Sequence, residues 1–225
     1  MKKHLFLLFV CFVSWVCEAR AWNHAIDIQT GNAYNFPVPL RFQQGSYNES
    51  LTANYSTRPF GPGAAPYYNI RYRNSMESNF LGLSASWWSF ELLHHKLWLD
   101  NRPPEVDEFR MTVGFNLIPV SFGGALYEWL NVFVGTGPIV VHPVNTVNGL
   151  TLPNEPKLWP TGERYTLVGW GVQVGAEAFY DLYESIFLNA ETRLTYSYSS
   201  VPIVNGSAKV HQASWHFHGG IGYRW

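Results

Sequence analysis

The stretch FELLHHKLWL, Phe90 to Leu99, places two histidines and a lysine in an apolar, aromatic-rich run. A neutral imidazole accepts a proton or binds a metal ion near neutral pH, and a lysine ammonium attracts phosphate as a point charge. A third candidate, His142, ends the apolar run NVFVGTGPIVVH. Whether these groups can act together depends on the faces of the elements that carry them.

Long segments of strict two-residue alternation predict those elements. In the C-terminal stretch ASWHFHGGIGYRW one face is apolar or aromatic and the other is polar or glycine, and the same split recurs over 168–180 and 186–198. Such segments exceed the ~5 to 6 residues of an ordinary strand and match the ~10-residue strands of a transmembrane barrel. We therefore expect an all-β fold, an antiparallel transmembrane outer-membrane β-barrel over 22–225. The alternative, a soluble sandwich, would carry more Lys and Glu on its solvent face.

The number of strands follows from turn lengths. Bacterial single-chain barrels have even strand numbers, short periplasmic turns and long extracellular loops. Eight strands result if 50–59 is an excursion within a long first loop, 36–65; ten remain open because the 80–99 segment is long. Short turns are expected at 77–79, 123–128 and 181–184, and long loops at 100–107, 143–163 and 200–210, so that the C-terminal strand runs towards the periplasm. The strand-like stretches are 24–35, 50–59, 66–76, 80–99, 108–122, 129–142, 164–180, 185–199 and 211–225.

The N-terminus predicts a signal peptide over 1–21. Two lysines precede an apolar run from Leu5 to Val16, and Ala19-Arg20-Ala21 offers a small-residue cleavage site. A lipoprotein signal around Cys17 is the alternative. Both cysteines of the chain lie in this leader, so the mature protein has neither disulfides nor thiolate metal sites. The leader holds three of the 15 basic and one of the 16 acidic residues, which leaves 12 against 15. The resulting charge of about −3 argues against a nucleic-acid partner.

An eight-stranded barrel has a lumen only wide enough to be filled by side chains. We therefore expect an internal polar network and no diffusion pore, and we place function at the rim, in the loops or on the outer wall. His95, His216 and His218 also take the inward parity. The network is expected to contain Asp27, Arg71, Arg73, Gln173, Glu177, Glu191 and Arg193.

The candidate residues take the outward parity. His94 and Lys96 share the face of Phe90, which we assign to lipid, and His142 lies opposite in parity to the glycines of GTG. With the third, fourth and fifth strands consecutive, His94, Lys96 and His142 are expected to form one polar cluster on the outer wall. The alternative is that His94, Lys96 and His142 only extend their polar ends to the membrane interface, with no role in chemistry. Polar groups on the lipid face are costly and usually functional, although the cost falls near the interface.

Several blocks carry a family resemblance. APYYNIRY (65–72), ELLHHKLW (91–98), FRMTVGFNLI (109–118), GTGPIVVHP (135–143) and VGAEAFYDLYESIFLNAETRLTYS (174–197) resemble the outer-membrane lipid A oxidase family and its uncharacterised β-barrel relatives. The most specific elements are the His-x-Lys of the third strand, the Gly-x-Asn-Leu of the fourth and the histidine of the fifth. The terminal Tyr-Arg-Trp resembles the C-terminal signal of outer-membrane barrels, which implies the barrel assembly machinery as a partner.

The resemblance implies oxidation of the proximal glucosamine of lipid A, with molecular oxygen as co-substrate, in the bacterial outer membrane. Its site residues would be His94, Lys96 and His142. The two histidines would bind a divalent metal or act as acid and base, and Lys96 would attract a lipid phosphate. At two positions this chain lacks polar groups of the family, within NFPVPL (35–40) and at Val113.

Two other functions stay open. A non-catalytic structural or adhesive surface barrel is suggested by the expected long loops 36–65 and 143–163 and by the two departures from the family. A lipid A deacylase or palmitoyltransferase is the third possibility, but the sequence offers no His-Ser pair with the expected spacing.

Overall fold

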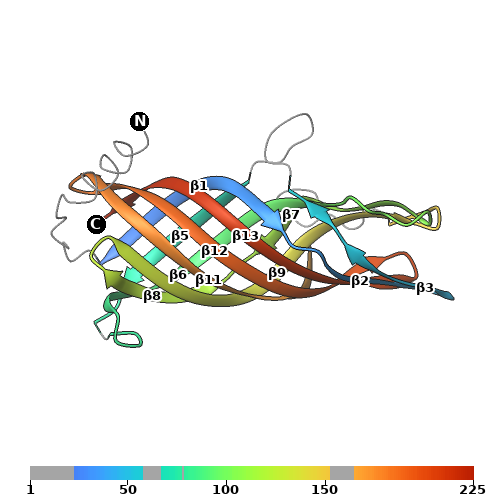
Figure 1. The fold of residues 1–225 in the computed structure, drawn as a ribbon, viewed down its shortest axis with the longest axis horizontal. Coiled ribbons are helices and arrows are strands. Elements are labelled where there is room, and N and C mark those ends of the chain that lie inside the picture. The colour runs from blue at the N-terminus through green and yellow to red at the C-terminus, as the bar shows by residue number, and fades with distance from the viewer. Residues whose placement is uncertain (1–22, 58–66, 78, 153–164) are drawn as a thin grey trace, which may run out of the picture.

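The computed structural model describes residues 23–57, 67–77, 79–152 and 165–225. The expected signal peptide and its cleavage site lie outside these residues. The described chain forms one antiparallel barrel whose neighbour order is β1-β5-β6-β7-β9-β11-β12-β13, and β13 pairs back with β1 to close the ring (Figure 1). The predicted all-β barrel with eight strand positions is confirmed for this part of the chain, and the ten-strand alternative is wrong.

Several positions of the ring are built from more than one strand segment. β1 and β2 both pair with β13 and are separated at Phe36-Pro37, whereas β7 and β8 both pair with β6 and β9 and are separated at Ile118-Pro119. Proline has no backbone N–H for the ladder, so it interrupts a strand. The strands are β1 (His24–Asn35), β2 (Val38–Gln44), β3 (Tyr47–Ala53), β4 (Tyr55–Ser56), β5 (Tyr68–Ser75), β6 (Ser84–Leu99), β7 (Val106–Leu117), β8 (Val120–Tyr127), β9 (Leu130–Val147), β10 (Leu150–Thr151), β11 (Thr166–Tyr183), β12 (Ile186–Ile203) and β13 (Gly206–Arg224).

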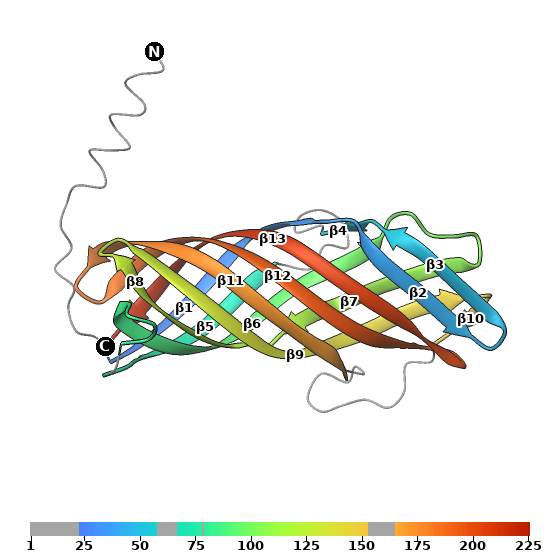
Figure 2. The ribbon, with the colours of Figure 1, turned by 60° about the horizontal axis from the view of Figure 1, so that its bottom comes forward.

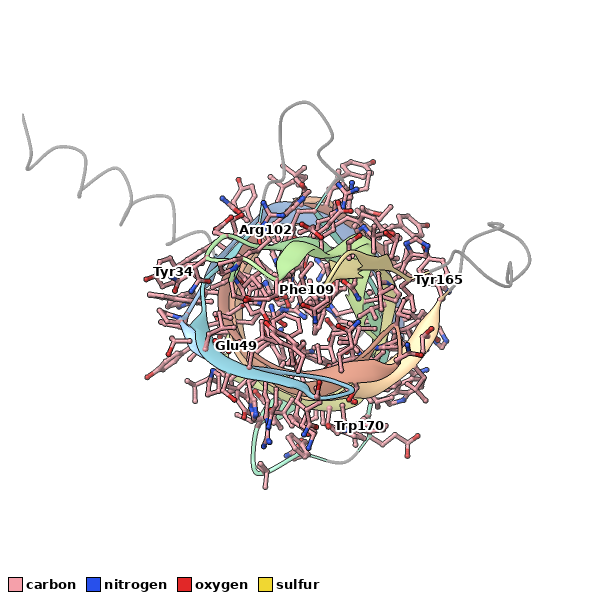
Figure 3. The ribbon with its side chains drawn as sticks, turned by 90° about the vertical axis from the view of Figure 1, so that its right-hand side faces the viewer. Tyr34, Glu49, Arg102, Phe109, Tyr165 and Trp170 are labelled. Atoms are coloured by element: carbon pink, nitrogen blue, oxygen red, sulfur yellow. The ribbon has the colours of Figure 1, made fainter. Side chains whose placement is uncertain are left out.

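The outer wall is apolar and aromatic. On β13 the outward positions Trp215, Phe217, Ile221 and Tyr223 are all exposed, and the inward positions Ser214, His216, His218 and Gly222 are buried. Figure 3 looks along the barrel and shows Tyr34 and Trp170 projecting from the wall. An exposed apolar band flanked by aromatic rings is the surface that a lipid bilayer covers. Among the described residues no helix is long and apolar enough to span a membrane.

The membrane half of the lumen is filled by charged side chains, as predicted. Arg71 contacts Asp27, Glu177 and Glu191 at 3.2, 2.5 and 2.7 Å, and Arg193 contacts Glu91 at 2.9 Å. Glu91 is a member that the predicted network did not include. All seven predicted network residues are buried: Asp27, Arg71, Arg73, Gln173, Glu177, Glu191 and Arg193.

The extracellular half of the lumen is apolar, which the sequence analysis did not anticipate. Phe42 of β2 and Phe109 of β7 lie edge to face, with centroids 5.0 Å apart, within a buried apolar cluster. Figure 3 shows Phe109 inside the ring. Above this cluster Gln44 donates to the carbonyl oxygens of Val147 and Val204. The extracellular end is therefore a closed, packed structure.

The described parts of the expected long loops are largely strands. The segment 36–65 contains the β2–β3 hairpin, which extends the barrel wall beside β13 (Figure 2). β9 continues to Val147, and a two-residue turn, Asn148-Gly149, leads to β10. Both turn residues have positive φ, 52° and 69°, for which Asn-Gly is the favoured pair. β12 and β13 likewise run through most of 200–210. The predictions of long loops at 36–65, 143–163 and 200–210 are wrong where these segments are described.

Candidate functional site

The candidate site lies on the outer wall of β6, β7 and β9. Along β6 the side chains of Leu93, His95 and Leu97 are fully buried inside the barrel. Because successive side chains alternate across a strand, the intervening residues His94 and Lys96 point outward. His142 of β9 alternates in the same way with the buried Val141. The three candidates therefore share the outer wall, in the arrangement that parity predicted.

His94 is outward-facing but covered. Only 6% of the residue is exposed, because the ring of Tyr68 stacks on it at 4.5 Å with an interplanar angle of 10°. Tyr68 and Asn116 are its register partners on β5 and β7. A contact between two neighbouring strands thus holds the imidazole flat against the wall.

Hydrogen bonds define the protonation of the His94 ring. Nδ2 of Asn116 donates to the carbonyl oxygen of Val140 at 3.0 Å, which directs its Oδ1 to His94. Oδ1 lies 2.7 Å from Nδ1 of His94, and an amide oxygen only accepts. Nδ1 therefore carries a proton, and when the ring is neutral the lone pair lies on Nε2. His94 is thus held as a base or ligand through Nε2.

Cations lie above His94 on the same face. Lys96 is partly exposed, and its Nζ lies 5.8 Å from the ring centroid of Trp98. Trp98 is the register partner of Arg110 on β7, which forms a 2.5 Å ion pair with Glu108. Two basic side chains therefore stand between His94 and the extracellular end of this wall.

His142 lies one strand further around the barrel. It is 5% exposed, the ring of Tyr165 is 6.1 Å away, and its Nδ1 is buried without a hydrogen-bond partner among the described residues. The register of β7 against β9 shifts beside it, between Met111 and Phe115. A β-bulge of this kind re-aims side chains and is frequent near functional sites.

The two histidines alone do not fit a shared metal ion. β7 lies between their strands, and strands two apart are separated by about 10 Å, whereas zinc–imidazole bonds are about 2.0–2.1 Å long. Across the described ranges no group of three His, Cys, Asp or Glu side chains could hold a metal ion. Each histidine is therefore placed to act separately, and His94 is placed to act as a base.

Sequence reasoning missed the residues that orient His94. Tyr68 and Asn116 lie within the blocks that carry the family resemblance, and Asn116 is the Asn of the Gly-x-Asn-Leu element. Their contacts with His94 depend on cross-strand register, which parity within one strand does not supply. The inward histidines behave as expected: His95, His216 and His218 are all buried in the lumen.

Comparisons with known proteins give likeness of fold only. No family model matches the chain, and no curated protein matches its sequence. Among solved structures it is similar to Ail, the attachment invasion locus protein of Yersinia pestis, at 13% identity and a TM-score of 0.40, covering 91% of this chain and 100% of Ail. It is also similar to OprG, an outer membrane protein of Pseudomonas aeruginosa, at 10% identity and a TM-score of 0.47, covering 91% and 96%. Neisserial surface protein A aligns at 11% identity and a TM-score of 0.40, over 90% and 97%.

The closed ring, the apolar outer wall and the filled lumen define the class of the protein. It is an eight-stranded β-barrel of the bacterial outer membrane.

Proposed function

We propose that this barrel binds the headgroup of lipid A at the outer wall of β6, β7 and β9 and oxidises the proximal glucosamine. The observation that carries the proposal is the contact of Nδ1 of His94 with Asn116, which leaves the Nε2 lone pair of the neutral ring as a base on the wall that also carries Lys96 and His142. The reaction is inferred from the family resemblance. The substrate is inferred from the position of the site, because lipid A forms the outer leaflet that surrounds this wall.

The reaction that fits is a two-electron oxidation at C1 of a proximal sugar that carries a free anomeric hydroxyl. The C1–H and anomeric O–H bonds break, a C1=O bond forms, and molecular oxygen takes up two electrons and two protons to become hydrogen peroxide. Water then opens the lactone to the aminogluconate, so the lipid gains one oxygen atom. Nε2 of His94 would accept the hydroxyl proton, and Lys96 would attract a lipid phosphate as a point charge. His142 would take the second acid-base role.

Mass spectrometry of lipid A tests the proposal. A Gram-negative host whose lipid A carries a free anomeric hydroxyl on the proximal sugar expresses the wild type, His94→Ala or His142→Ala, with and without oxygen. We expect an oxygen-dependent gain of one oxygen atom with the wild type and none with either variant. His24→Ala, which removes a histidine beside Tyr72 and Trp225 at the other end of the barrel, is the matched control and should retain conversion. Heat-modifiable migration on gels verifies folding, and unchanged lipid A in the folded wild type would exclude the oxidase activity.

A second function, a non-catalytic adhesive surface barrel, is favoured by one specific observation. The β2–β3 hairpin extends the wall beyond the aromatic band and presents exposed polar side chains near its tip, Ser46 and Asn48. Replacing both by Glu should reduce adhesion of the expressing bacteria to epithelial monolayers if this function holds, while lipid A stays unchanged. Equal adhesion of variant and wild type would remove the hairpin as an adhesive surface.

A further inference from the structure

A second basic patch lies on the opposite flank of the barrel, over β13 and β2. It consists of Arg41, Lys209 and His211, and we call it the β13–β2 patch. Arg41 and Lys209 are direct register partners across the two strands. Their chain neighbours on both sides are buried inside the barrel: Leu40, Phe42, Ala208 and Val210 are at most 1% exposed. Strand alternation therefore points both cations outward, side by side.

The positions around this pair are uncharged. The strands on either side place Ser200 beside Lys209 and Ser50 beside Arg41. Nε of Arg41 donates to the side-chain oxygen of Asn48 at 3.0 Å, which fixes the guanidinium over the wall. Glu49 of β3 is the register partner of the inward-facing Phe42, so its side chain lies on the inner face of the sheet. The outward faces of the neighbouring rungs carry Pro39, Gln43, Asn48, Thr52, Pro202 and Ser207.

The third member of the patch marks its height. His211 is the register partner of Tyr198, with ring centroids 5.0 Å apart, and its Nδ1 lies 2.8 Å from the hydroxyl of Tyr196. Both tyrosines are nearly half exposed, at 45% and 49%, and exposed tyrosines of this kind form the aromatic girdle at the membrane interface. Lys209 lies two residues further towards the extracellular end, about 7 Å along the strand. With a strand tilt of roughly 40°, this is about 5 Å above the girdle.

We propose that the β13–β2 patch binds the phosphate of an outer-leaflet lipid headgroup. Two adjacent cations with no carboxylate at the outward register positions beside them suit a doubly charged phosphate. A height just above the aromatic girdle places them among headgroups rather than in the extracellular solution, which favours a membrane lipid over a soluble polyanion. β1 and β5 lie between β13 and β6 in the ring, so this site is separate from the wall of His94. It holds a lipid without transforming it.

Native mass spectrometry of the full protein in detergent micelles measures this binding. The probes are bis-phosphorylated lipid A and the same lipid after chemical dephosphorylation. The test variant is Arg41→Gln/Lys209→Gln, and Arg41→Lys/Lys209→Arg keeps both charges. Each cation near a charged headgroup contributes about fivefold in affinity, so the Gln variant should raise the Kd at one site roughly thirtyfold. The charge-retaining variant should bind as the wild type does.

Three further results decide the proposal. Dephosphorylated lipid A should bind the Gln variant and the wild type equally. Lys96→Gln should leave binding at the β13–β2 patch intact, so loss of the proposed lipid A chemistry and loss of this site are distinguishable. An unchanged Kd for the phosphorylated probe in the folded Gln variant would overturn the proposal. So would displacement of the lipid by soluble heparin fragments at physiological salt, which would identify an extracellular polyanion as the ligand.

Discussion

The hydroxyl oxygen of Tyr67 lies 2.5 Å from Nε2 of His218 inside the barrel, and 2.5 Å from Nδ1 of His216. At the far side of His218, Nδ1 lies 3.2 Å from Oε1 of Glu191. At the far side of His216, Nε2 lies 2.9 Å from the hydroxyl of Thr195. The five side chains form one continuous hydrogen-bond chain between the apolar and the charged parts of the lumen.

The donors in this chain can be assigned. Glu191 is paired with two arginines, so its carboxylate only accepts and Nδ1 of His218 donates. Nε2 of a neutral His218 then accepts the single proton of Tyr67. Because that proton is used, Nδ1 of His216 donates to the Tyr67 oxygen, and its Nε2 accepts from Thr195. Both histidines are therefore neutral Nδ1–H tautomers.

Nitrogen NMR of labelled protein in lipid nanodiscs should report the Nδ1–H tautomer for both His216 and His218. Tyr67→Phe removes the shared oxygen and leaves an N–H and a lone pair without partners. We expect the free energy of unfolding to fall by about 1–3 kcal/mol, measured by urea titration with tryptophan fluorescence. An Nε2–H tautomer of His218 in the wild type would contradict the assignment.

The charged network contains more acids than bases. Three arginines, Arg71, Arg73 and Arg193, face four carboxylates. Oε1 of Glu177 accepts hydrogen bonds from Arg71, Arg73 and Asn189. Oε2 of Glu177 is buried without a hydrogen-bond partner among the described residues. Glu177→Gln keeps the accepting oxygen and removes one surplus negative charge. We expect the free energy of unfolding to change by less than about 1 kcal/mol.

Arg71→Met is the contrasting change in the same network. It removes the partner of three buried carboxylates, and we expect a loss of about 3–5 kcal/mol. Urea titration in vesicles measures both variants. Equal losses of unfolding free energy for Glu177→Gln and Arg71→Met would contradict the prediction that Glu177 carries a surplus negative charge.

The extracellular apolar cluster should depend on the contact between Phe42 and Phe109. Phe109→Ala leaves a cavity in a site that is 2% exposed, with a cost of about 3–5 kcal/mol. Limited proteolysis should become faster within the β2–β3 hairpin while the membrane part stays protected. Phe217→Ala is the control, because this ring is 48% exposed on the lipid side and its removal leaves no internal cavity.

Gly137 of β9 permits a close approach of two backbones. A Cβ at this position would lie 2.1 Å from the carbonyl oxygen of Ile118, where β7 and β8 are separated. Gly137→Ala should therefore reduce the folded fraction in a refolding assay scored by heat-modifiable migration. Gly219→Ala is the matched control, since its nearest contact is 3.9 Å, and it should refold normally.

The sequence by itself determined the two faces of the wall. Alternation is a local property of a strand, so inward residues such as Glu177 and Arg193 and outward residues such as His94 and His142 could be assigned without knowing any partner strand. The length of the alternating segments likewise determined the barrel, because soluble strands are shorter.

Only the tertiary structure decided what covers and fills those faces. Tyr68 and Asn116 meet His94 through the register of three strands, and Phe42 meets Phe109 across the barrel although 67 positions separate them in the chain. Within the predicted loop 36–65, the segment 38–53 forms a hairpin because its apolar residues Leu40 and Phe42 are buried in the apolar cluster of the lumen, beside β13. Such contacts join residues that are distant in sequence, and a periodic pattern carries no information about which distant strand supplies the partner.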